Sequence, residues 1–381
     1  MKDERIYLDN SATTRVCEEA AAKAAELMRS TYGNPSSIHE MGFAAEKEMT
    51  AAREAVAKAL GVNVGEITFT SGGTEANNLA IFGGVESKKR SGNKIVTTAV
   101  EHPSVLRCME KLEQQGYEVT YLQPDKTGRI SEAELADAID DKTILVSIML
   151  VNNEVGAIQP VEAAAKAIAA KKAPSLLHVD AVQAFGKLAV KPKRMKIDLL
   201  SISSHKIHGP KGVGALYVAE GVHLRPQLLG GGQEKGLRSG TEPMPMIGAF
   251  GAAVKALPDP AESLKQMQTL SDYCREQLST IDGVVFNSPA DALPYIVNFS
   301  TMSVRSETMI HFLSAQNIYV SGGSACSGGK ESYVLTAMNV GRPAVRSSIR
   351  VSFSRYSTKG DVDALVAAVA RGVKTLAKGK L

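Results

Sequence analysis

The sequence Ile197-Asp198-Leu199-Leu200-Ser201-Ile202-Ser203-Ser204-His205-Lys206-Ile207-His208-Gly209-Pro210-Lys211-Gly212 carries the strongest structural signal in the chain. Its apolar first part, residues 197–202, predicts a buried strand, and glycine and proline break the second part into a polar loop. Lys206 therefore lies at a strand end, beside hydroxyl and imidazole groups. In such a place burial and nearby positive charge make a neutral lysine amine available, which can form a Schiff base with an aldehyde cofactor. The alternative is a solvated surface lysine.

The same pattern extends on both sides of this stretch. Apolar runs predict strands at residues 67–70, 94–98, 144–149, 176–179, 199–203 and 213–218, and the helical stretches between them include residues 75–87, 104–115 and 161–171. This alternation predicts an α/β fold with a mostly parallel central sheet and helices on both faces. In such sheets ligands bind beyond the carboxyl ends of the strands.

The composition changes near Leu257-Pro258-Asp259-Pro260. Beyond it the pattern is helix, strand (295–299), helix, strand (349–353) and helix (361–378), which predicts a smaller α+β domain. The short apolar run at residues 6–8 is expected to dock on that domain. We therefore expect a large domain at residues 16–256 and a small domain at residues 1–15 and 257–381.

Composition excludes several classes of function. The 381 residues carry a net charge of +4 with both signs interspersed, which argues against nucleic-acid or membrane partners. The N-terminus shows no secretion signal and no apolar run is long enough to span a membrane. The four cysteines are dispersed without CxxC spacing, which predicts a cytoplasmic protein with no disulfide framework and no metal site.

Two further strand ends carry groups that suit a phosphorylated pyridine ring. Phe69-Thr70-Ser71-Gly72-Gly73-Thr74-Glu75-Ala76-Asn77-Asn78 predicts a strand, a glycine turn and a helix start, where backbone N–H groups near Gly73 and Thr74 can bind a phosphate. In His178-Val179-Asp180-Ala181-Val182-Gln183, Asp180 can keep a pyridine nitrogen protonated and Gln183 can hydrogen-bond a ring hydroxyl. An ordinary capped turn and a helix-capping aspartate are the alternatives.

His102 and Asn153 follow two other predicted strands. His102, in Glu101-His102-Pro103-Ser104, can stack on a planar cofactor and carry protons, since a helix N-terminus disfavours the charged imidazole. Asn153, in Asn152-Asn153-Glu154-Val155-Gly156, can orient a ring oxygen or a substrate carboxylate. A structural histidine near a helix start is the alternative for His102.

The motifs SGGTEANN, EHPS, VNNEVG, HVDAVQ, SSHKIHGPKG and RSGTE occur in this order along nearly the whole chain. Together they closely resemble the NifS/IscS-type cysteine desulfurases, which are class V, fold-type I enzymes dependent on pyridoxal 5'-phosphate (PLP). The resemblance implies that Lys206 binds PLP and moves the substrate Cα proton, that Asp180 pairs with the pyridine nitrogen, that Gln183 binds the phenolic oxygen and that His102 stacks on the ring.

The resemblance also implies how the phosphate is held. Gly73, Thr74, Ser203 and His205 would bind it within one chain. Thr241, in Arg238-Ser239-Gly240-Thr241, would reach the phosphate of a partner subunit, which implies a homodimer with active sites at the interface.

Cys326 lies in Val320-Ser321-Gly322-Gly323-Ser324-Ala325-Cys326-Ser327-Gly328-Gly329-Lys330. Glycine and serine on both sides predict a mobile loop and an accessible, reactive thiol, whereas Cys17, Cys108 and Cys274 lie in helical contexts and are expected to be structural. The family assigns the sulfur-accepting nucleophile to this position, and a thiolate there can become a transferable persulfide.

Arg350, in Ser347-Ser348-Ile349-Arg350-Val351-Ser352-Phe353, is the expected clamp for the substrate carboxylate, since guanidinium binds carboxylates in a bidentate way. Arg355 is the nearby competitor, and a surface arginine is the alternative.

We therefore expect an L-cysteine desulfurase that forms L-alanine and a persulfide on Cys326 and passes the sulfur to an acceptor protein. An iron–sulfur scaffold and a tRNA-thiolating enzyme are the acceptors considered. The alternatives are a selenocysteine lyase or cysteine sulfinate desulfinase, and a sulfur-relay or scaffold protein without catalysis, against which Lys206, Asp180 and His102 argue.

Overall fold

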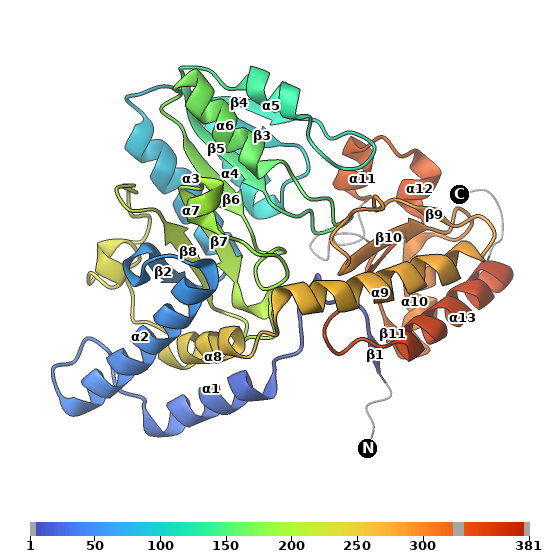
Figure 1. Cartoon of the computed structure of the whole chain (residues 1–381), viewed down its shortest axis with the longest axis horizontal. Helices are drawn as coiled ribbons and strands as arrows, with labels where there is room; N and C mark the ends of the chain where they lie inside the picture. The colour runs from blue at the N-terminus through green and yellow to red at the C-terminus, as the bar shows by residue number, and fades with distance from the viewer. Residues whose placement is uncertain (1–4, 323–330, 377–381) are drawn as a thin grey trace.

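A seven-stranded sheet forms the centre of the protein (Figure 1), which is described from a computed structural model covering residues 5–322 and 331–376. The strand order is β2-β8-β7-β6-β5-β3-β4. These strands are β2 (Ile67–Thr70), β3 (Lys94–Thr98), β4 (Glu118–Leu122), β5 (Thr143–Met149), β6 (Leu176–Asp180), β7 (Leu199–Ser203) and β8 (Gly214–Val218).

The sheet is mostly parallel. β4, β3, β5, β6 and β7 run parallel to one another, and β8 pairs antiparallel with both β7 and β2. The predicted α/β class with a mostly parallel sheet is confirmed, and each predicted strand of this sheet is present. β4 at the edge was not predicted, and neither was the reversed direction of β8.

Helices cover both faces of the sheet because successive residues of a strand point to opposite sides. Leu199 packs with the apolar residues of α3 (Gly73–Lys88) and α4 (Pro103–Gln114), whereas Leu200 belongs to the cluster formed with α2 (Glu40–Leu60) and α6 (Val161–Lys171). Both leucines are fully buried. Burial of such a side chain contributes about 1.5–3 kcal/mol, so a one-residue shift of the strand would exchange its partners on both faces.

The remaining elements of this part are short or peripheral. They are α1 (Glu18–Ser30), α5 (Glu132–Ala138), α7 (Pro192–Met195) and α8 (Met244–Lys255), with 3-10 helices at Val64–Glu66, Ser204–Lys206 and Glu234–Gly236. α8 packs against α1 and α2, and Phe250 of α8 meets Phe69 of β2 edge to face at 6.4 Å. Figure 1 shows α1, α2 and α8 together at one end of the molecule.

Two smaller sheets lie beside the central one (Figure 1). The first is antiparallel in the order β12-β10-β9, and the second pairs β1 in parallel with β11. The prediction that the first strand docks on the C-terminal part is therefore confirmed. The bounds are β1 (Ile6–Tyr7), β9 (Val285–Phe286), β10 (Ile296–Ser300), β11 (Ile318–Tyr319) and β12 (Ser348–Ser352), with helices α9 (Pro260–Ser279), α10 (Ser306–Ser314), α11 (Tyr333–Ala337), α12 (Arg342–Arg346) and α13 (Lys359–Leu376).

One apolar cluster extends through both parts of the chain. It includes Leu8 near the N-terminus, Phe250 of α8 and Ile296 of β10. The division into domains at residues 15/16 and 256/257 therefore stays a prediction. Among the described helices, none combines the length and the apolar character that crossing a membrane requires.

Candidate active site

The carboxyl ends of β3, β6 and β7 meet the start of α3 at a cavity of about 230 Å³. The fold thus brings together residues that lie up to 339 positions apart in the sequence, Ser11 and Arg350 being the extremes. The predicted site residues that line the cavity are Gly73, Thr74, His102, Asn153, Asp180, Gln183, Ser203, His205, Lys206 and Arg350.

Two predicted residues are not among them. Thr241 is exposed and does not line this cavity, so its reach to a partner subunit stays a prediction. Cys326 lies outside the described residues.

Lys206 ends the 3-10 turn that directly follows β7. Its Nζ donates to the carbonyl oxygens of Ser11 and Ala12, the latter at 2.8 Å. The N-terminal segment therefore closes over the lysine and holds its amine at the cavity wall. No sequence pattern indicated this role for Ser11 and Ala12, because it depends on a contact across more than 190 residues.

Asp180 ends β6 and is buried, and both of its carboxylate oxygens accept hydrogen bonds. Oδ1 accepts from the backbone N–H of Val182 at 3.0 Å, and Oδ2 accepts from Asn77 Nδ2 at 2.8 Å. Asn77 also donates to Ser104 Oγ at 2.9 Å, so it joins α3, α4 and β6. Sequence reasoning missed Asn77, although it lies one helical turn after Gly73 in a motif already singled out.

His102 is the N-cap of α4, which explains its orientation. Its Nδ1 accepts the backbone N–H of Ser104 at 3.2 Å, so the neutral ring carries its proton on Nε2. Burial lowers the pKa of His102, and Lys206 lowers it further while Asp180 opposes the shift. Burial therefore favours the neutral form that the sequence predicted.

The other end of the cavity suits an anion. α3 begins at Gly73 beside Ser203, which is buried, and a Cβ on Gly73 would lie 2.8 Å from Val182 Cγ2. His205 Nδ1 lies 3.1 Å from Thr13 Oγ1. Burial and the neighbouring positive charge of Lys206 lower the pKa of His205 to about 3. A neutral imidazole, hydroxyl groups and free helical N–H groups form a donor set for a phosphate.

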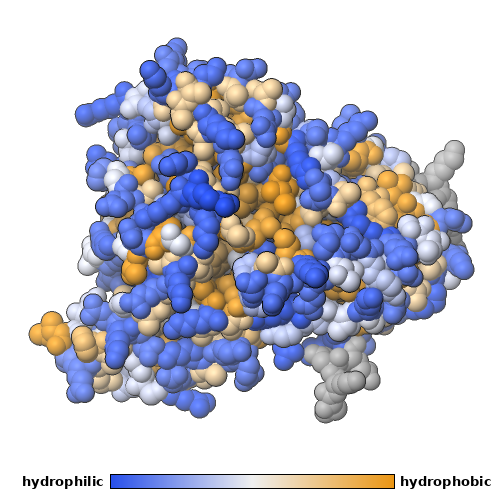
Figure 2. Space-filling model, in the orientation of Figure 1, coloured by the Kyte–Doolittle hydropathy of each residue, from blue (hydrophilic) through white to orange (hydrophobic). Residues whose placement is uncertain are grey.

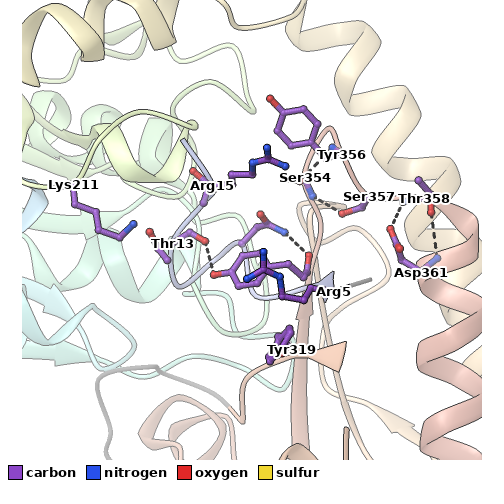
Figure 3. Close-up of a pocket in the computed structure, with 13 residues that line it drawn as sticks. Arg5, Thr13, Arg15, Lys211, Tyr319, Ser354, Tyr356, Ser357, Thr358 and Asp361 are labelled. Atoms are coloured by element: carbon purple, nitrogen blue, oxygen red, sulfur yellow. Dashed lines mark hydrogen bonds between the residues drawn. The ribbon is translucent and has the colours of Figure 1, made fainter. Parts of the chain in front are cut away.

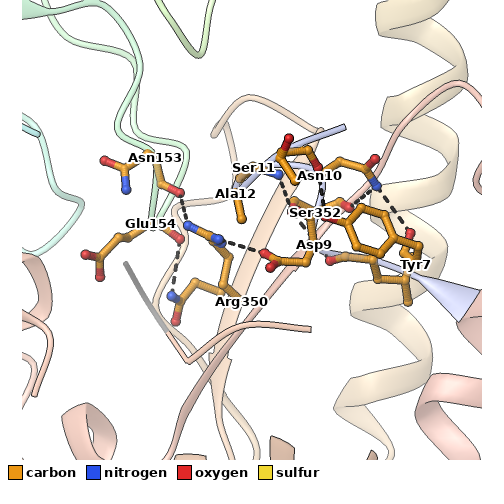
Figure 4. A network of polar contacts seen from close by, with 12 residues as sticks. Tyr7, Asp9, Asn10, Ser11, Ala12, Asn153, Glu154, Arg350 and Ser352 are labelled. Atoms are coloured by element: carbon orange, nitrogen blue, oxygen red, sulfur yellow. Dashed lines mark hydrogen bonds and ion pairs between the residues drawn. The ribbon is translucent and has the colours of Figure 1, made fainter. Parts of the chain in front are cut away.

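Arg350 of β12 also lines the cavity and is 1% exposed, and Figure 4 shows its guanidinium group between Asn153 and Asp9. Its Nη1 donates to the carbonyl oxygen of Asn153 at 2.9 Å, and its Nη2 pairs with Asp9 Oδ1 at 2.8 Å. Arg355 does not line this cavity, and its Nη1 donates to the carbonyl oxygen of Ala256. The geometry therefore favours Arg350 over Arg355 as the group that meets a substrate carboxylate.

Behind His102, Glu101 is fully buried. Its Oε1 accepts from Thr98 Oγ1 and from the backbone N–H of Met149, each at 2.8 Å. Burial nevertheless raises the pKa of Glu101 to about 8. Sequence reasoning missed this residue, because only the fold shows that it lies beneath the cavity wall.

A larger groove of about 970 Å³ borders the same N-terminal segment (Figure 3). Its wall includes Asn10, Thr13 and Arg15, together with Lys211 and Tyr356. None of the predicted site residues lines it, and the smaller cavity around Lys206 is therefore the candidate active site.

Three buried atoms of the smaller cavity lack a hydrogen-bond partner among the described residues: Ser11 Oγ, Asn77 Oδ1 and Asn153 Oδ1. Buried polar atoms are normally paired, so their clustering indicates a polar ligand that pairs with them. The donor set of lysine amine, buried carboxylate and phosphate-binding helix start fits PLP. Among residues 5–322 and 331–376, no cluster of histidine, cysteine and acidic residues could hold a metal ion. Fold and site together define a PLP-dependent enzyme of fold type I.

Comparison with known proteins agrees. The chain matches the aminotransferase class-V family over residues 6–365. It is 41% identical over 379 residues to a protein of Methanosarcina thermophila named cysteine desulfurase IscS, covering 98% of this chain and 93% of the relative. A solved NifS-like protein superimposes with a TM-score of 0.92 at 39% identity, covering 97% of this chain and 99% of that chain. A structure described as SspA in complex with cysteine superimposes with a TM-score of 0.82 at 35% identity, covering 92% and 99%.

The chain therefore belongs to the aminotransferase class-V family, as one of its NifS/IscS-type cysteine desulfurases. The sequence-based assignment to this family, the fold type and the PLP dependence that follows from family membership are confirmed.

Proposed function

We propose that this chain is an L-cysteine desulfurase that releases L-alanine and passes sulfur through Cys326 to an acceptor. The observation that carries the proposal is the single cavity in which Lys206, Asp180 and His102 meet three unpaired buried polar atoms. A structure in the same fold family is described as a complex with cysteine, which supports cysteine as the substrate.

PLP, when bound, supplies an electron sink for the negative charge that develops at the substrate Cα. Lys206 holds the cofactor and its Nζ moves the Cα proton. Asp180, kept in place by Asn77 and Val182, keeps a proton on the pyridine nitrogen, and Gln183 donates to the ring oxygen. Arg350 and Asn153 bind the substrate carboxylate.

The phosphate is assigned to Gly73, Thr74, Ser203 and His205, with Thr241 of the partner subunit completing the set. Support for a homodimer comes from large apolar side chains that are exposed in the single chain: Tyr32, Ile38, Phe43, Leu228 and Leu229. Figure 2 shows apolar atoms at the outer end of α1 and α2, where several of them lie. Leu228 forms a β-bridge with Arg238, so this exposed leucine lies next to the segment that carries Thr241.

The sulfur step is a transfer between two thiols. The Cys326 thiolate attacks the substrate sulfur, an S–S bond forms, and the Cβ–S bond breaks. The electron pair of the broken bond stays with Cβ, which gains a proton and becomes the methyl group of alanine. His102 Nε2 is assigned as the carrier of that proton. The other three cysteines are buried, and burial raises the pKa of both Cys108 and Cys274 to about 12, which leaves Cys326 as the reactive thiol.

The acceptor is proposed to be an iron–sulfur scaffold, as the names of the IscS relatives suggest, or a tRNA-thiolating enzyme. A cytoplasmic location is proposed with it, because cysteines that stay free require a reducing compartment.

The test compares three proteins after purification with PLP. Wild type should be yellow, should lose that colour with borohydride, and should form equal amounts of alanine and transferred sulfur from cysteine. Cys326→Ala should stay yellow but lose cysteine turnover, and Lys206→Ala should lose both. If Lys206→Ala still releases sulfur, the proposal is wrong. Turnover of selenocysteine or cysteine sulfinate by Cys326→Ala would instead indicate a lyase or desulfinase.

A further inference from the structure

Lys187 is a buried lysine that the proposed reaction does not use. It is 7% exposed and lies four residues after Gln183. Its Nζ donates to Gln183 Oε1 at 3.2 Å and lies 5.6 Å from the centre of the Tyr295 ring. Within residues 5–322 and 331–376 it forms no ion pair with a carboxylate. A buried ammonium group without a counter-charge is costly, so this position calls for an explanation.

The contact with Gln183 fixes which way the amide faces. In its charged form Lys187 only donates, so the amide oxygen of Gln183 then faces Lys187 and the amide nitrogen faces away. Nε2 does so, donating to the carbonyl oxygen of Ser11 at 2.9 Å, and the side chain lines the active-site cavity. The same carbonyl oxygen accepts from Lys206 Nζ. Gln183 and Lys206 thus share one carbonyl oxygen, and Lys187 is connected to it through the Gln183 amide.

The distribution of charge also links Lys187 to Lys206. A second cavity of about 30 Å³ has both Lys187 and Lys206 in its wall, together with Arg355 and His208 and no acidic residue. Burial, together with the positive charges of Lys206 and Arg350, lowers the pKa of Lys187 to about 7. The repulsion is mutual, so a charged Lys187 also disfavours a proton on Lys206 Nζ.

We propose that Lys187 is a positioning residue of the cofactor site: it keeps the amide N–H groups of Gln183 turned toward the ring oxygen of PLP and places positive charge behind Lys206. This inference rests on the proposed function. Without Lys187 the Gln183 amide is free to turn its oxygen toward the ring oxygen, which replaces a donor by an acceptor. Loss of the donor and loss of the like charge both favour a proton at Lys206 Nζ.

The test is a pH titration of the visible absorbance of the PLP-loaded enzyme, which reports the proton at Lys206 Nζ without substrate or turnover. Lys187→Met should raise the midpoint by about one pH unit, the size usual for losing one nearby charge or hydrogen bond. Lys187→Gln, which keeps a donor without the charge, should give a smaller rise. Lys191→Met is the matched control, because Lys191 is also partly buried but donates to the carbonyl oxygen of Ala59, away from the cavity. Its midpoint should equal that of wild type.

A midpoint for Lys187→Met equal to that of wild type overturns the positioning role. Should both Lys187 variants fail to fold, a crystal structure of the PLP-loaded wild type decides: Nε2 of Gln183 within hydrogen-bond distance of the ring oxygen supports the inference, and a reversed amide or a separated Lys187 refutes it. A wild-type protein that never acquires the visible band contradicts the proposed function itself, which separates the two failures.

Discussion

Asn77 shows how much a single amide contributes to this site. Asn77 donates one of the two hydrogen bonds that the Asp180 carboxylate accepts, and it also donates to Ser104. It carries no charge and takes no part in the reaction itself. A hydrogen bond to a charged group is worth about 1.5–3 kcal/mol, which corresponds to roughly a tenfold effect or more. Residues of this kind orient the groups that react.

We therefore expect Asn77→Ala to lower kcat for cysteine by about tenfold or more, because the carboxylate of Asp180 loses the contact that directs it. Steady-state alanine formation measures the effect. Asn78→Ala is the matched control, since the neighbouring amide donates to the carbonyl oxygen of Thr74 instead of to Asp180. Equal loss in the two variants would mean that the damage lies in α3 as a whole.

The buried carboxyl group of Glu101 should make the stability of the fold depend on pH. Burial raises its pKa from 4.5 to about 8, so between these values the folded protein holds a proton that the unfolded chain releases. The contribution to stability is present below pH 4.5 and is lost as the pH rises toward 8. Glu101→Gln keeps the amide oxygen as acceptor for Thr98 and Met149 and cannot titrate.

The slope of the free energy of unfolding against pH should therefore be more positive for Glu101→Gln than for wild type, by up to about 1.4 kcal/mol per pH unit within that window. Urea titrations at several pH values between 5 and 8 provide the measurement. Parallel pH curves for the two proteins would show that Glu101 is ionised in the fold.

At the scale of elements, a buried ion pair holds the turn before the segment that carries Thr241. Arg53 of α2 meets Glu234 in a two-pronged contact of 2.6 and 2.7 Å, and Glu234 also accepts from the backbone N–H of Phe69 at 2.9 Å. The side chains are 16% and 2% exposed. Glu234 and Lys235 both have positive φ, which side chains with a Cβ disfavour, so the contact helps to hold a strained turn.

Arg53→Met should cost about 3–5 kcal/mol of stability, since it leaves the Glu234 carboxylate buried and unpaired. It should also weaken PLP binding if Thr241 reaches the partner's site. Arg107→Met is the matched control: its pair with Glu110 has the same 2.6 Å contact, but the side chains are 74% and 46% exposed. Thermal unfolding should show a much larger loss of stability for Arg53→Met than for Arg107→Met. Similar losses in both variants would show that burial adds nothing to the contribution of the Arg53–Glu234 pair.

The elements also show where sequence reasoning succeeds. β5, β6 and β7 were predictable because every residue in them is buried, so apolar residues dominate and only single polar residues occur between them. β4 was missed because it lies at the sheet edge, where Glu118 is exposed and polar residues interrupt the run. The reversed direction of β8 leaves no mark in its own sequence, since alternation and burial are the same for a strand of either direction.

The residues of the candidate active site also divide into those that the sequence predicts and those that it does not. Residues at strand ends, such as Asp180 and Lys206, were found because polar groups directly follow apolar runs. Ser11 and Ala12 of the cavity wall, and Asp9 beside Arg350, were not found, since they reach these places only when the N-terminal segment pairs with β12, more than 340 residues away in sequence. Contacts of that separation depend on the completed fold.

Across the described part of the chain, burial strongly lowers the pKa of three histidines besides His102. Burial lowers the pKa of His178 to about 4, of His205 to about 3 and of His208 to about 4, from 6.5 in each case. His178 shows why burial is tolerated: its ring nitrogens lie 2.8 Å from Ser147 Oγ and 3.0 Å from Ser201 Oγ, so a neutral ring is fully paired. Unfolding exposes all three rings to water and lets them take up protons.

Below pH 6.5 the unfolded chain therefore binds up to three protons that the folded protein refuses, and stability falls as the pH falls toward 4. Glu101 opposes this with one proton above pH 4.5, which leaves a net of about two, or roughly 2.7 kcal/mol per pH unit at the steepest point. Urea titrations at pH 6.5 and 5, with PLP saturating, measure the slope. His178→Gln should reduce it by about one proton, and His311→Gln on the exposed face of α10 is the matched control. If stability is flat across this range, the buried rings are charged in the fold and the polar layer around His178 has a different arrangement.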